Sequence, residues 1–365
     1  MKILVYGISG GIGGIENLVF NIISVLAKQD MQFDIITYYD QIDNEELYKS
    51  MGVHIYKMTS KRENPLKNRS EFKEFFKKHA SEFDAVWCNL AELINIDILK
   101  LAKQYGIKRR IIHSHSTAST RGKLLTFLHK KNKRKIGSIA TDFWACSEAA
   151  GRWFFSDDII NSERFHVIKN GIRTERFGFD PDLRKSVREE LEIGDSLLLG
   201  HIARLDIQQK NTLFLLSVFN EILKTHSDAK LLIIGDGPDR TLIERQIKES
   251  GIETAVIMLG FRKDASRFLN AMDAFILPSP HEGLAIVLIE AQTNGLPCFA
   301  SEGVPYESDI TGLVNFINLE KPPEYWAKQI LETLPAERIS KEEEVVSAGY
   351  NITHSAAEIK QIIEN

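Results

Sequence analysis

Short apolar runs alternate with longer amphipathic stretches along the first half of the chain. Short runs rich in Val, Ile, Leu and Phe are typical of buried strands, and the stretches between them, such as 16–28 and 94–104, have the apolar spacing of helices. Strands that alternate with helices predict a parallel sheet joined by right-handed crossovers. The strands expected here are 2–6, 33–37, 53–56, 84–88, 110–113, 142–146 and 165–168.

The same alternation begins again in the second half, after a turn dipeptide at Asn170-Gly171. This predicts an α/β fold of two doubly wound, Rossmann-like domains, over residues 1–170 and 171–349. A last amphipathic helix, within about 350–365, is expected to pack back on the first domain. The strands expected in the second half are 197–203, 230–234, 256–259, 274–277 and 297–300.

The loops that follow the strands are where we expect the chemistry. Open parallel sheets bind ligands beyond the carboxyl ends of their strands, and two such sheets facing each other would leave a central cleft.

Composition agrees with a two-domain globular protein. The 365 residues exceed one ordinary core, and no apolar run approaches the roughly 20 residues needed to span a bilayer. Cys88, Cys146 and Cys298 are odd in number and far apart, so we expect buried thiols rather than a disulfide framework or a zinc site. These features predict a cytoplasmic protein.

The net charge of -4 hides a difference between the two halves. Residues 1–170 hold 26 Lys and Arg against 19 Asp and Glu, whereas residues 171–365 hold 20 against 31. A basic first half indicates an anionic surface that faces this half alone.

The loop after the first expected strand holds five glycines between Gly7 and Gly14, ahead of Glu16. Glycines let backbone N–H groups approach a ligand, and the helix N-terminus that follows favours an anion; a tight turn is the plainer alternative. The start of the loop also resembles the cofactor loop of short-chain dehydrogenases. Those enzymes need a Lys four residues after a Tyr, which none of the nine tyrosines has; Tyr105 is followed by Arg109 instead, so this alternative is disfavoured.

A second candidate loop runs from Arg204 to Lys210, after the first strand of the second half. A helical pattern begins at Asn211. Two cations beside a helix N-terminus suit a diphosphate, because an Arg side chain can donate hydrogen bonds to two phosphate oxygens at once and Lys adds a point charge. For an isolated Arg and Lys, a solvated loop would be the simpler interpretation.

A third candidate loop follows strand 274–277 and contains Glu282, before a helix expected to start near Leu284. Glu290 would then lie about two turns inside an apolar helix, where a buried carboxylate needs a partner. The two hydroxyls of a ribose would serve, although a backbone or Arg partner would also do. A fourth candidate is His113-Ser114-His115-Ser116, which places two histidines at a strand end but offers no third ligand for zinc.

At this point the residues resemble a known family. Glu282-x7-Glu290, in a Pro-Ser-x-x-Glu-Gly context, resembles the signature of glycosyltransferase family 4, which has the GT-B fold of two Rossmann-like domains. The run 272–297 most resembles bacterial capsule and exopolysaccharide enzymes. The other matching segments, each at an expected strand end or domain junction, are Gly13-Gly14-x-Glu16, 167–171, 203–211, 234–238 and 259–261.

The resemblance implies roles for these residues. Arg204 and Lys210 would hold the diphosphate, and Glu282 would bind the donor sugar. Glu290 would bind the ribose, and His115, with His113 as the alternative, would contact the sugar and the diphosphate. Six steps separate Arg204 from Lys210, where many members show five, so the loop residue that meets the phosphate stays open. The implied catalytic residues are His115, Arg204, Lys210 and Glu282, and the further donor contacts are Gly13, Gly14, Gly235, Gly260, Phe261, Arg262, Gly283, Leu284, Ala285, Ile286 and Glu290, of which 260–262 would border the base.

The implied reaction is a retaining transfer from a nucleotide sugar, in the first place a UDP-sugar, to a glycan acceptor in capsule or exopolysaccharide synthesis. The acceptor hydroxyl would attack from the face that the diphosphate leaves, and the leaving phosphate would take its proton. Catalysis would then be mainly electrostatic. No metal and no cofactor is expected, because cations already serve the diphosphate and the strand-end loops hold no Asp-x-Asp motif.

Two other functions are considered. A non-hydrolysing UDP-sugar epimerase would share the fold and the ligand but need no acceptor, and an inactive transferase-like subunit would only stabilise a partner. The presence of Arg204, Lys210, Glu282 and Glu290 together argues against the second, since a scaffold need not keep all four. No nucleic-acid partner is expected.

A basic stretch follows the His115 loop and indicates a membrane contact. Residues 121–135 hold seven Lys and Arg and no acidic residue, with leucines and Phe127 interleaved at the start. An amphipathic basic helix suits the headgroups of an anionic membrane, as a lipid-linked acceptor would require, whereas a solvated helix face is the plainer alternative. The expected contact residues are Lys130, Lys131, Lys133, Arg134 and Lys135, on a protein peripheral to the inner face of the cell membrane.

Overall fold

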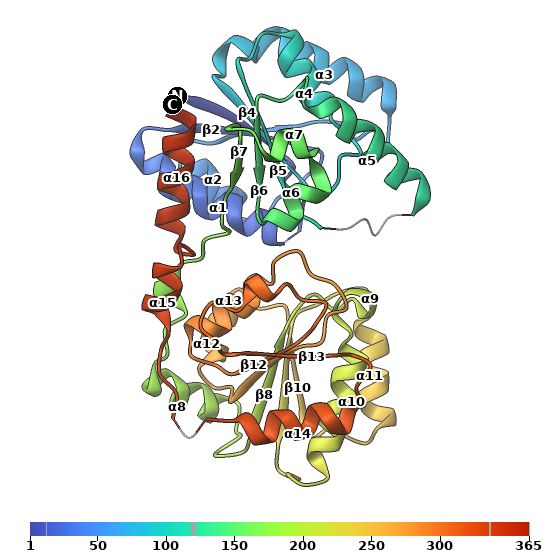
Figure 1. Ribbon diagram of the computed structural model, residues 1–365, viewed down its shortest axis with the longest axis vertical. Coiled ribbons are helices and arrows are strands. Elements are labelled where there is room, and N and C mark those ends of the chain that lie inside the picture. Colours follow the sequence, from blue (N-terminus) through green and yellow to red (C-terminus); the bar gives the residue numbers. More distant parts are fainter. Residues whose placement is uncertain (12, 118–121, 336, 365) are drawn as a thin grey trace. The chain divides into compact units, whose positions relative to one another are not determined.

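The computed structural model describes residues 1–365 except 12, 118–121, 336 and 365. The chain forms two compact units, one of Met1–Ile172 together with Ile352–Asn365 and the other of Arg173–Asn351. Each unit is a parallel sheet with helices on both faces (Figure 1).

Among the described residues, the first unit contains a seven-stranded sheet of order β3-β2-β1-β4-β5-β6-β7. Its central strands are buried on both faces, as their continuous apolar runs require, whereas the edge strands β3 and β7 are only partly buried. In β1, for example, Ile3 and Val5 enter one core cluster and Leu4 and Tyr6 the other. The strands are β1 (Lys2–Tyr6), β2 (Gln32–Thr37), β3 (His54–Lys57), β4 (Ala85–Leu90), β5 (Arg109–Ser114), β6 (Asp142–Ala145) and β7 (Phe165–Val167).

The helices of the first unit cover both faces of its sheet. The cluster on one face takes apolar side chains from α1, α2 and α16, and the cluster on the other face takes them from α3 to α7. The helices are α1 (Gly14–Leu26), η1 (Ala27–Gln29), α2 (Glu45–Ser50), α3 (Pro65–His79), η2 (Ala80–Glu82), α4 (Asp97–Gln104), α5 (Lys123–Ile136), α6 (Glu148–Phe154), α7 (Asp157–Ile160) and α16 (Ile352–Glu364).

The second unit repeats the design, with strand order β10-β9-β8-β11-β12-β13 in the part of the chain that the structure describes. The sequence pattern missed β13, an edge strand of four residues whose middle is only half-buried, so its apolar signal is weak. The strands are β8 (Leu198–Ile202), β9 (Lys230–Ile234), β10 (Val256–Gly260), β11 (Ala274–Leu277), β12 (Cys298–Ser301) and β13 (Val314–Ile317).

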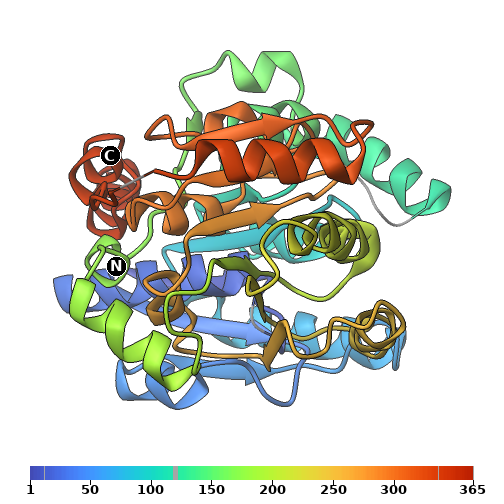
Figure 2. The same cartoon turned by 90° about the horizontal axis from the view of Figure 1, so that it is seen from below.

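Two sets of helices sandwich the second sheet. On one face α10 and α14 lie side by side with α11, as Figures 1 and 2 show, and α8, α12 and α13 supply the core of the other face. The helices are η3 (Thr174–Arg176), α8 (Pro181–Glu190), α9 (Ile207–Lys210), α10 (Thr212–Leu223), α11 (Arg240–Glu249), α12 (Ala265–Leu269), α13 (Ile286–Thr293), η4 (Tyr306–Ser308), α14 (Pro323–Thr333) and α15 (Glu342–Ser347).

The last helix, α16, belongs to the first unit and packs along α1. Its buried stripe includes Ile359 and Ile363. Arg109 of β5 donates hydrogen bonds to the carbonyl groups of Ile362 and Ile363, the last turn of this helix, while its guanidinium also pairs with Asp142 at 2.8 Å. A cation at a helix C-terminus stabilises the exposed carbonyl groups. Arg109 therefore holds the C-terminal end of α16 against the amino-terminal end of β5.

Candidate functional site

The loops that follow β8 to β12 meet at the carboxyl edge of the second sheet, because its strands run parallel. Glycines let these loops touch. A Cβ on Gly235, which has φ +141°, would lie 1.8 Å from the carbonyl oxygen of Ala203. The loop after β12, which sequence reasoning missed, is held equally close, since a Cβ on Gly303 would lie 1.9 Å from the Pro280 carbonyl oxygen. The edge is therefore a compact set of loops.

Arg204 is exposed on the loop after β8, and its side chain has no hydrogen bond or ion pair among the residues that the structure describes. The expectation of a loop as far as Lys210 was wrong, because Ile207–Lys210 form the short helix α9. Asp206 caps this turn by accepting a hydrogen bond from the Gln209 amide at 3.2 Å. This cap favours a helical turn ahead of Asn211, where the sequence predicted that the helix begins.

Lys210 and Glu282 are brought together across 72 positions of the chain. The Lys210 Nζ lies 2.5 Å from Glu282 Oε1, and the two side chains are 20% and 13% exposed. Beneath them His201 of β8 is fully buried, and it donates from Nδ1 to the Ile276 carbonyl oxygen at 2.9 Å. Burial, together with the Lys210 charge, lowers the pKa of His201 to about 4, so this histidine is neutral. The sequence placed a cation and a carboxylate here but did not predict their pairing.

Glu290 lies in α13, about one turn from its start rather than two, because the helix begins at Ile286 and not near Leu284. Its carboxylate has no hydrogen bond or ion pair within the described part of the chain. Burial raises the pKa of Glu290 to about 8, since nothing stabilises its charge. The carboxyl group of Glu290 is therefore available to accept hydrogen bonds from a ligand.

The backbone at the start of α13 corrects one expected donor contact. The Ile286 amide donates to the Leu284 carbonyl oxygen at 3.0 Å, so it is not the open anion-binding group that the sequence predicted. Gly283, Leu284 and Ala285 lie in the turn between Glu282 and the helix, and Ala285 is buried.

The loop after β10 joins the same edge. Gly260 has φ +66°, and its carbonyl oxygen accepts a hydrogen bond from the Gly235 amide at 2.8 Å, which ties this loop to the one after β9. Phe261 is 49% exposed, an unusual position for an aromatic ring. Arg262 forms two hydrogen bonds of 2.8 Å with Asp264, so its guanidinium group is already engaged. Of these residues, the Phe261 ring is the group most open to a planar ligand.

The carboxyl edge of the first sheet carries the glycine loop. Glu16, in the first turn of α1, accepts a hydrogen bond from the Ser9 amide at 2.8 Å, and a Cβ on Gly13 would lie 2.5 Å from its carboxylate. Gly14, the first residue of α1, faces open space. Ile12 lies outside the described residues. A carboxylate of the protein thus already occupies part of the expected anion site.

The two histidines at the carboxyl end of β5, His113 inside the strand and His115 just after it, differ sharply in exposure. His113 is fully buried and lies against Trp87 and Trp144, so the expectation that it stands at the open strand end was wrong. His115 is half-buried, and its Nε2 lies 2.9 Å from Asn89 Oδ1. Burial lowers the pKa of His115 to about 3, which leaves a neutral ring. Of the two histidines, His115 is the one whose side chain is partly exposed.

The basic helix α5 has an outward face that mixes apolar and basic side chains. Leu124 and Phe127 are 73% and 63% exposed, and Lys130, Lys131, Arg134 and Lys135 are exposed beyond them. Lys133 does not belong to this face, because it donates to the carbonyl oxygens of Arg152 and Trp153 at 2.6 and 3.0 Å. Arg121 lies outside the described residues.

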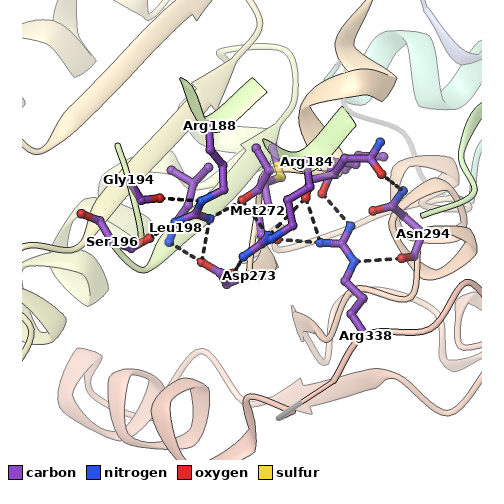
Figure 3. A network of polar contacts seen from close by, with 12 residues as sticks. Arg184, Arg188, Gly194, Ser196, Leu198, Met272, Asp273, Asn294 and Arg338 are labelled. Carbon is purple, nitrogen blue, oxygen red and sulfur yellow. Dashed lines mark hydrogen bonds and ion pairs between the residues drawn. The ribbon is translucent and has the colours of Figure 1, made fainter. Parts of the chain in front are cut away.

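The amino-terminal edge of the second sheet holds a different network, shown in Figure 3. Arg184 and Arg188 of α8 both pair with Asp273, which precedes β11. Arg338 donates to the carbonyl oxygens of Leu269, Asn270, Met272 and Asn294, at 2.7 to 3.3 Å. A cavity of about 510 Å³ adjoins Arg184 and Arg338. Because the guanidinium groups are engaged with the protein itself, we assign this edge a structural role.

The possible metal ligands, the cysteines and the helix lengths also bear on the chemistry. No group of three or more His, Cys, Asp or Glu side chains there is placed to hold a metal ion. The three cysteines are free and buried, as expected, and burial raises the pKa of each thiol. None of the described helices has the length and apolar character needed to cross a bilayer.

Comparison with known proteins gives two family matches. Residues 12–176 match the model described as "Glycosyltransferase Family 4", and residues 196–335 match "Glycosyl transferases group 1". EpsF of Bacillus subtilis, described as a glycosyltransferase, is 31% identical over 93% of this chain and 90% of its own length. The UDP-Gal:α-D-GlcNAc-diphosphoundecaprenol α-1,3-galactosyltransferase of Escherichia coli is 30% identical over 39% of this chain and 38% of its own length. CapM of Staphylococcus aureus, a capsular polysaccharide glycosyltransferase, is 25% identical over 49% and 46%.

Solved structures show the same fold. HepE of Anabaena in complex with UDP has a TM-score of 0.81 at 16% identity, with both chains covered completely. WaaG, a glycosyltransferase of lipopolysaccharide biosynthesis, has a TM-score of 0.67 at 15% identity, with 99% of this chain and 95% of its own covered. The expected GT-B fold of two parallel-sheet α/β domains is confirmed.

Proposed function

The chain belongs to glycosyltransferase family 4, and on that premise we propose that it transfers a sugar from a nucleotide diphosphate to a hydroxyl group of a glycan acceptor. The observation that carries the proposal is the set of charged groups at the carboxyl edge of the second sheet. Arg204 is unpaired, Lys210 pairs with Glu282, and Glu290 has a carboxyl group without a partner among the described residues. Cations beside two carboxyl groups suit a ligand that combines phosphates with sugar hydroxyls.

The proposed roles follow from the chemistry of each group. Arg204 and Lys210 bind the diphosphate, because Arg forks two oxygens and Lys adds a compact charge. Glu282 accepts hydrogen bonds from the donor sugar, and Glu290 accepts them from the ribose hydroxyls. Phe261 is the aromatic face for the base. UDP is the first choice of nucleotide, because HepE, a relative in fold, binds UDP.

We propose a retaining reaction in three bond changes. The acceptor oxygen bonds to the anomeric carbon on the face that the diphosphate leaves, the bond from that carbon to the diphosphate oxygen breaks, and the acceptor proton passes to the leaving phosphate. Arg204 and Lys210 stabilise the charge that develops on the diphosphate, an electrostatic contribution of the kind that usually dominates such steps. His115, neutral and half-buried, is proposed to contact the sugar rather than to carry a proton.

Metal independence is part of the proposal, since the two cations supply the charge that a divalent ion would otherwise provide. Activity in EDTA should equal activity in buffer alone. Loss of activity on chelation, restored by manganese, would refute this part.

The acceptor is proposed to be a lipid-linked glycan of capsule or exopolysaccharide synthesis. The names of two relatives support this, since one acts on a diphosphoundecaprenol and another is a capsular polysaccharide enzyme. The exposed face of α5 supplies a matching surface, with Phe127 and Leu124 for the interfacial layer and Lys130, Lys131 and Arg134 for anionic headgroups. We propose that this face brings the protein to the membrane.

Co-sedimentation with phosphatidylglycerol vesicles tests this surface. A variant with Lys130, Lys131, Arg134 and Lys135 changed to Gln should lose most of its binding at low salt, because each engaged charge contributes roughly 1 kcal/mol. Lys133→Gln is the control, since that side chain faces the protein. Equal sedimentation of wild type and the fourfold variant would show that the membrane contact lies elsewhere.

The function as a whole is tested with a panel of UDP-, GDP- and ADP-sugars. A UDP-sugar should raise the melting temperature most, Arg204→Ala should abolish that rise, and turnover should require an acceptor. Conversion of the donor without any acceptor would identify an epimerase, and nucleotide binding without turnover would identify an inactive partner subunit. Absence of stabilisation by every nucleotide sugar would refute the proposal.

A further inference from the structure

Tyr306 is an exposed aromatic residue at the carboxyl edge of the second sheet, on the loop that follows β12. It is 63% exposed, and its ring packs against the half-buried Phe316 of β13, with the two ring centroids 4.4 Å apart and the ring planes at 52°. The Tyr306 hydroxyl has no hydrogen-bond partner among the described residues. Protein atoms therefore support one side of the ring, and the other side is open to a ligand.

The backbone around Tyr306 forms an ordered turn. Pro305, which fixes its own φ at -57°, precedes the short helix η4, and the amides of Ser308 and Asp309 donate to the carbonyl oxygens of Pro305 and Tyr306 at 2.9 and 3.0 Å. The Asp309 side chain also accepts a hydrogen bond from the Val314 amide at 3.3 Å, which ties the turn to the start of β13. The ring is thus held in place before any ligand binds, so little entropy is lost when a ligand packs on it.

The loop that carries Tyr306 is bonded to the loop that carries Glu282. The Glu282 amide donates to the Gly303 carbonyl oxygen at 3.2 Å, and the Ser301 hydroxyl donates to the Ser279 carbonyl oxygen. Tyr306 follows Gly303 by three residues, so the two Cα atoms lie within roughly 11 Å of each other. The open ring and the Glu282 carboxylate therefore belong to one fixed pair of neighbouring loops.

The order of the strands shows which part of a donor would reach this ring. β11 lies between β8 and β12 in the sheet, so the loop of Glu282 separates the loop of Lys210 from the loop of Tyr306. In the proposed function the diphosphate binds at Lys210 and the sugar at Glu282. The end of the sugar that is farthest from the diphosphate then meets the loop after β12. The proposed attack takes place at the opposite end of the sugar, next to the diphosphate, so a side chain here can recognise the sugar without obstructing the reaction.

We propose that Tyr306 packs against the sugar ring of the nucleotide-sugar donor and contributes to the choice of that sugar. The proposal rests on the proposed function, which places the sugar at Glu282. A sugar ring of the pyranose type carries C–H groups on its faces and hydroxyl groups around its rim, so an aromatic ring can cover a face while the rim stays hydrogen-bonded. The direction of a single hydroxyl decides how flat that face is. A fixed aromatic ring therefore distinguishes sugars that differ at one carbon, by the modest factor that apolar contacts provide.

Calorimetry of the full-length protein with UDP, UDP-glucose, UDP-galactose and UDP-N-acetylglucosamine tests the proposal. Tyr306→Ala should bind the sugar donor that wild type prefers about fivefold more weakly, the scale of one aromatic contact. UDP affinity should stay within about twofold of wild type, because UDP has no sugar beyond its diphosphate. The preference among the three sugar donors should fall, since a sugar that fits the ring poorly has less contact to lose.

Two control variants separate this contact from simpler effects. Tyr306→Phe keeps the ring and removes the hydroxyl, so its affinity for the preferred donor should stay within about twofold of wild type. Tyr325→Ala removes another exposed tyrosine of the same unit, which is 41% exposed and lies under the Lys321 ammonium at 5.4 Å, and it should leave all four affinities within about twofold. Melting curves without ligand show that each variant is folded.

The outcomes are distinct. If wild type binds a sugar donor and Tyr306→Ala binds it as tightly, the contact is wrong and the proposed function stands. Equal weakening of UDP and of the sugar donors in Tyr306→Ala, a loss in Tyr306→Phe as large as that in Tyr306→Ala, or a wild type without preference among the three sugars would each overturn the contact as well. If wild type binds neither UDP nor any of the three sugar donors, the proposed use of the site fails and the contact with it.

Discussion

At the amino-terminal edge of the second sheet, Arg338 donates hydrogen bonds to four backbone carbonyl groups, whereas at the carboxyl edge the Arg204 side chain has no partner among the described residues. Both edges are rich in charged groups. At the first, Asp273 receives two arginines, and at the second, Glu290 has a carboxyl group without a partner within the described chain. The same residue types therefore have protein partners at one end of the sheet and lack them at the other, among the residues that the structure describes.

The difference shows how a charged cluster can be interpreted. Arg338 is half-buried, and burial lowers its pKa to about 9, yet every contact that it makes is with the protein itself. Arg338 therefore satisfies backbone carbonyl groups at the place where α12, α13 and the segment before α15 meet. At the carboxyl edge, by contrast, burial of Glu290 raises its pKa because no partner compensates its charge. Unsatisfied groups, rather than the density of charge, mark the candidate site.

The largest expected effect is on stability, at the amino-terminal edge. Arg338→Met should lower the free energy of unfolding of the second unit by about 3–5 kcal/mol, because four carbonyl groups lose their donor. Urea denaturation followed by tryptophan fluorescence measures the change. Arg245→Met, on the exposed face of α11, is the matched control and should change stability by less than about 0.5 kcal/mol. A loss below about 1 kcal/mol for Arg338→Met would contradict the structural role.

The reverse pattern is expected at Arg204. Arg204→Ala should reduce turnover by about 10²–10³, the scale of losing one transition-state charge contact, with unfolding free energy almost unchanged. Lys210→Ala should reduce turnover on the same scale. Steady-state kinetics on folded protein provides the measurement, with Arg245→Ala as the control. Wild-type rates in a folded Arg204→Ala protein would place the diphosphate elsewhere.

The carboxyl groups of Glu290 and Glu282 should affect the binding of different parts of the donor. Glu290→Gln should weaken both UDP and UDP-sugar by about tenfold, because the ribose is common to both and the carboxyl group that meets its hydroxyls is lost. Glu282→Gln should weaken only the sugar-bearing donor. Calorimetry with the two ligands measures both variants. Equal losses for UDP and UDP-sugar in both variants would show that the groups do not divide the donor in this way.

The last expected effect is the pH dependence of stability that Glu290 confers. Its pKa of about 8 in the folded protein exceeds the usual value of 4.5, so the folded state holds a proton that the unfolded state has released between these two values. Wild-type stability should therefore fall as pH rises from about 4.5 to about 8. Glu290→Gln should remove this slope and melt above wild type at pH 8 but not at pH 5. Parallel melting curves of the two proteins across this range would contradict the unpartnered carboxyl group.

The repeated pattern of apolar strands and amphipathic helices was sufficient to predict both parallel sheets, and the resemblance of the loop motifs to a known family added the GT-B fold. Buried parallel strands must be continuous apolar runs, and such runs are visible in the sequence as they stand. Short strands at an edge, such as β13, need less apolar surface and were missed. Glycine loops were equally visible, because close approach of the backbone excludes a Cβ, as Gly235 shows.

What the sequence could not determine is which of its charged groups are partnered. His113 and His115 are two residues apart, yet His113 is fully buried and His115 is half-buried, because His113 lies inside β5 and His115 lies beyond the end of this strand at Ser114. Lys133 sits among exposed lysines but turns to two carbonyl groups of α6. The pairing of Lys210 with Glu282 spans 72 positions. The sequence by itself determined the residue types and their local spacing. The partner of each charged group was decided only by the tertiary structure, because the packed sheets bring together loops that are far apart in the sequence.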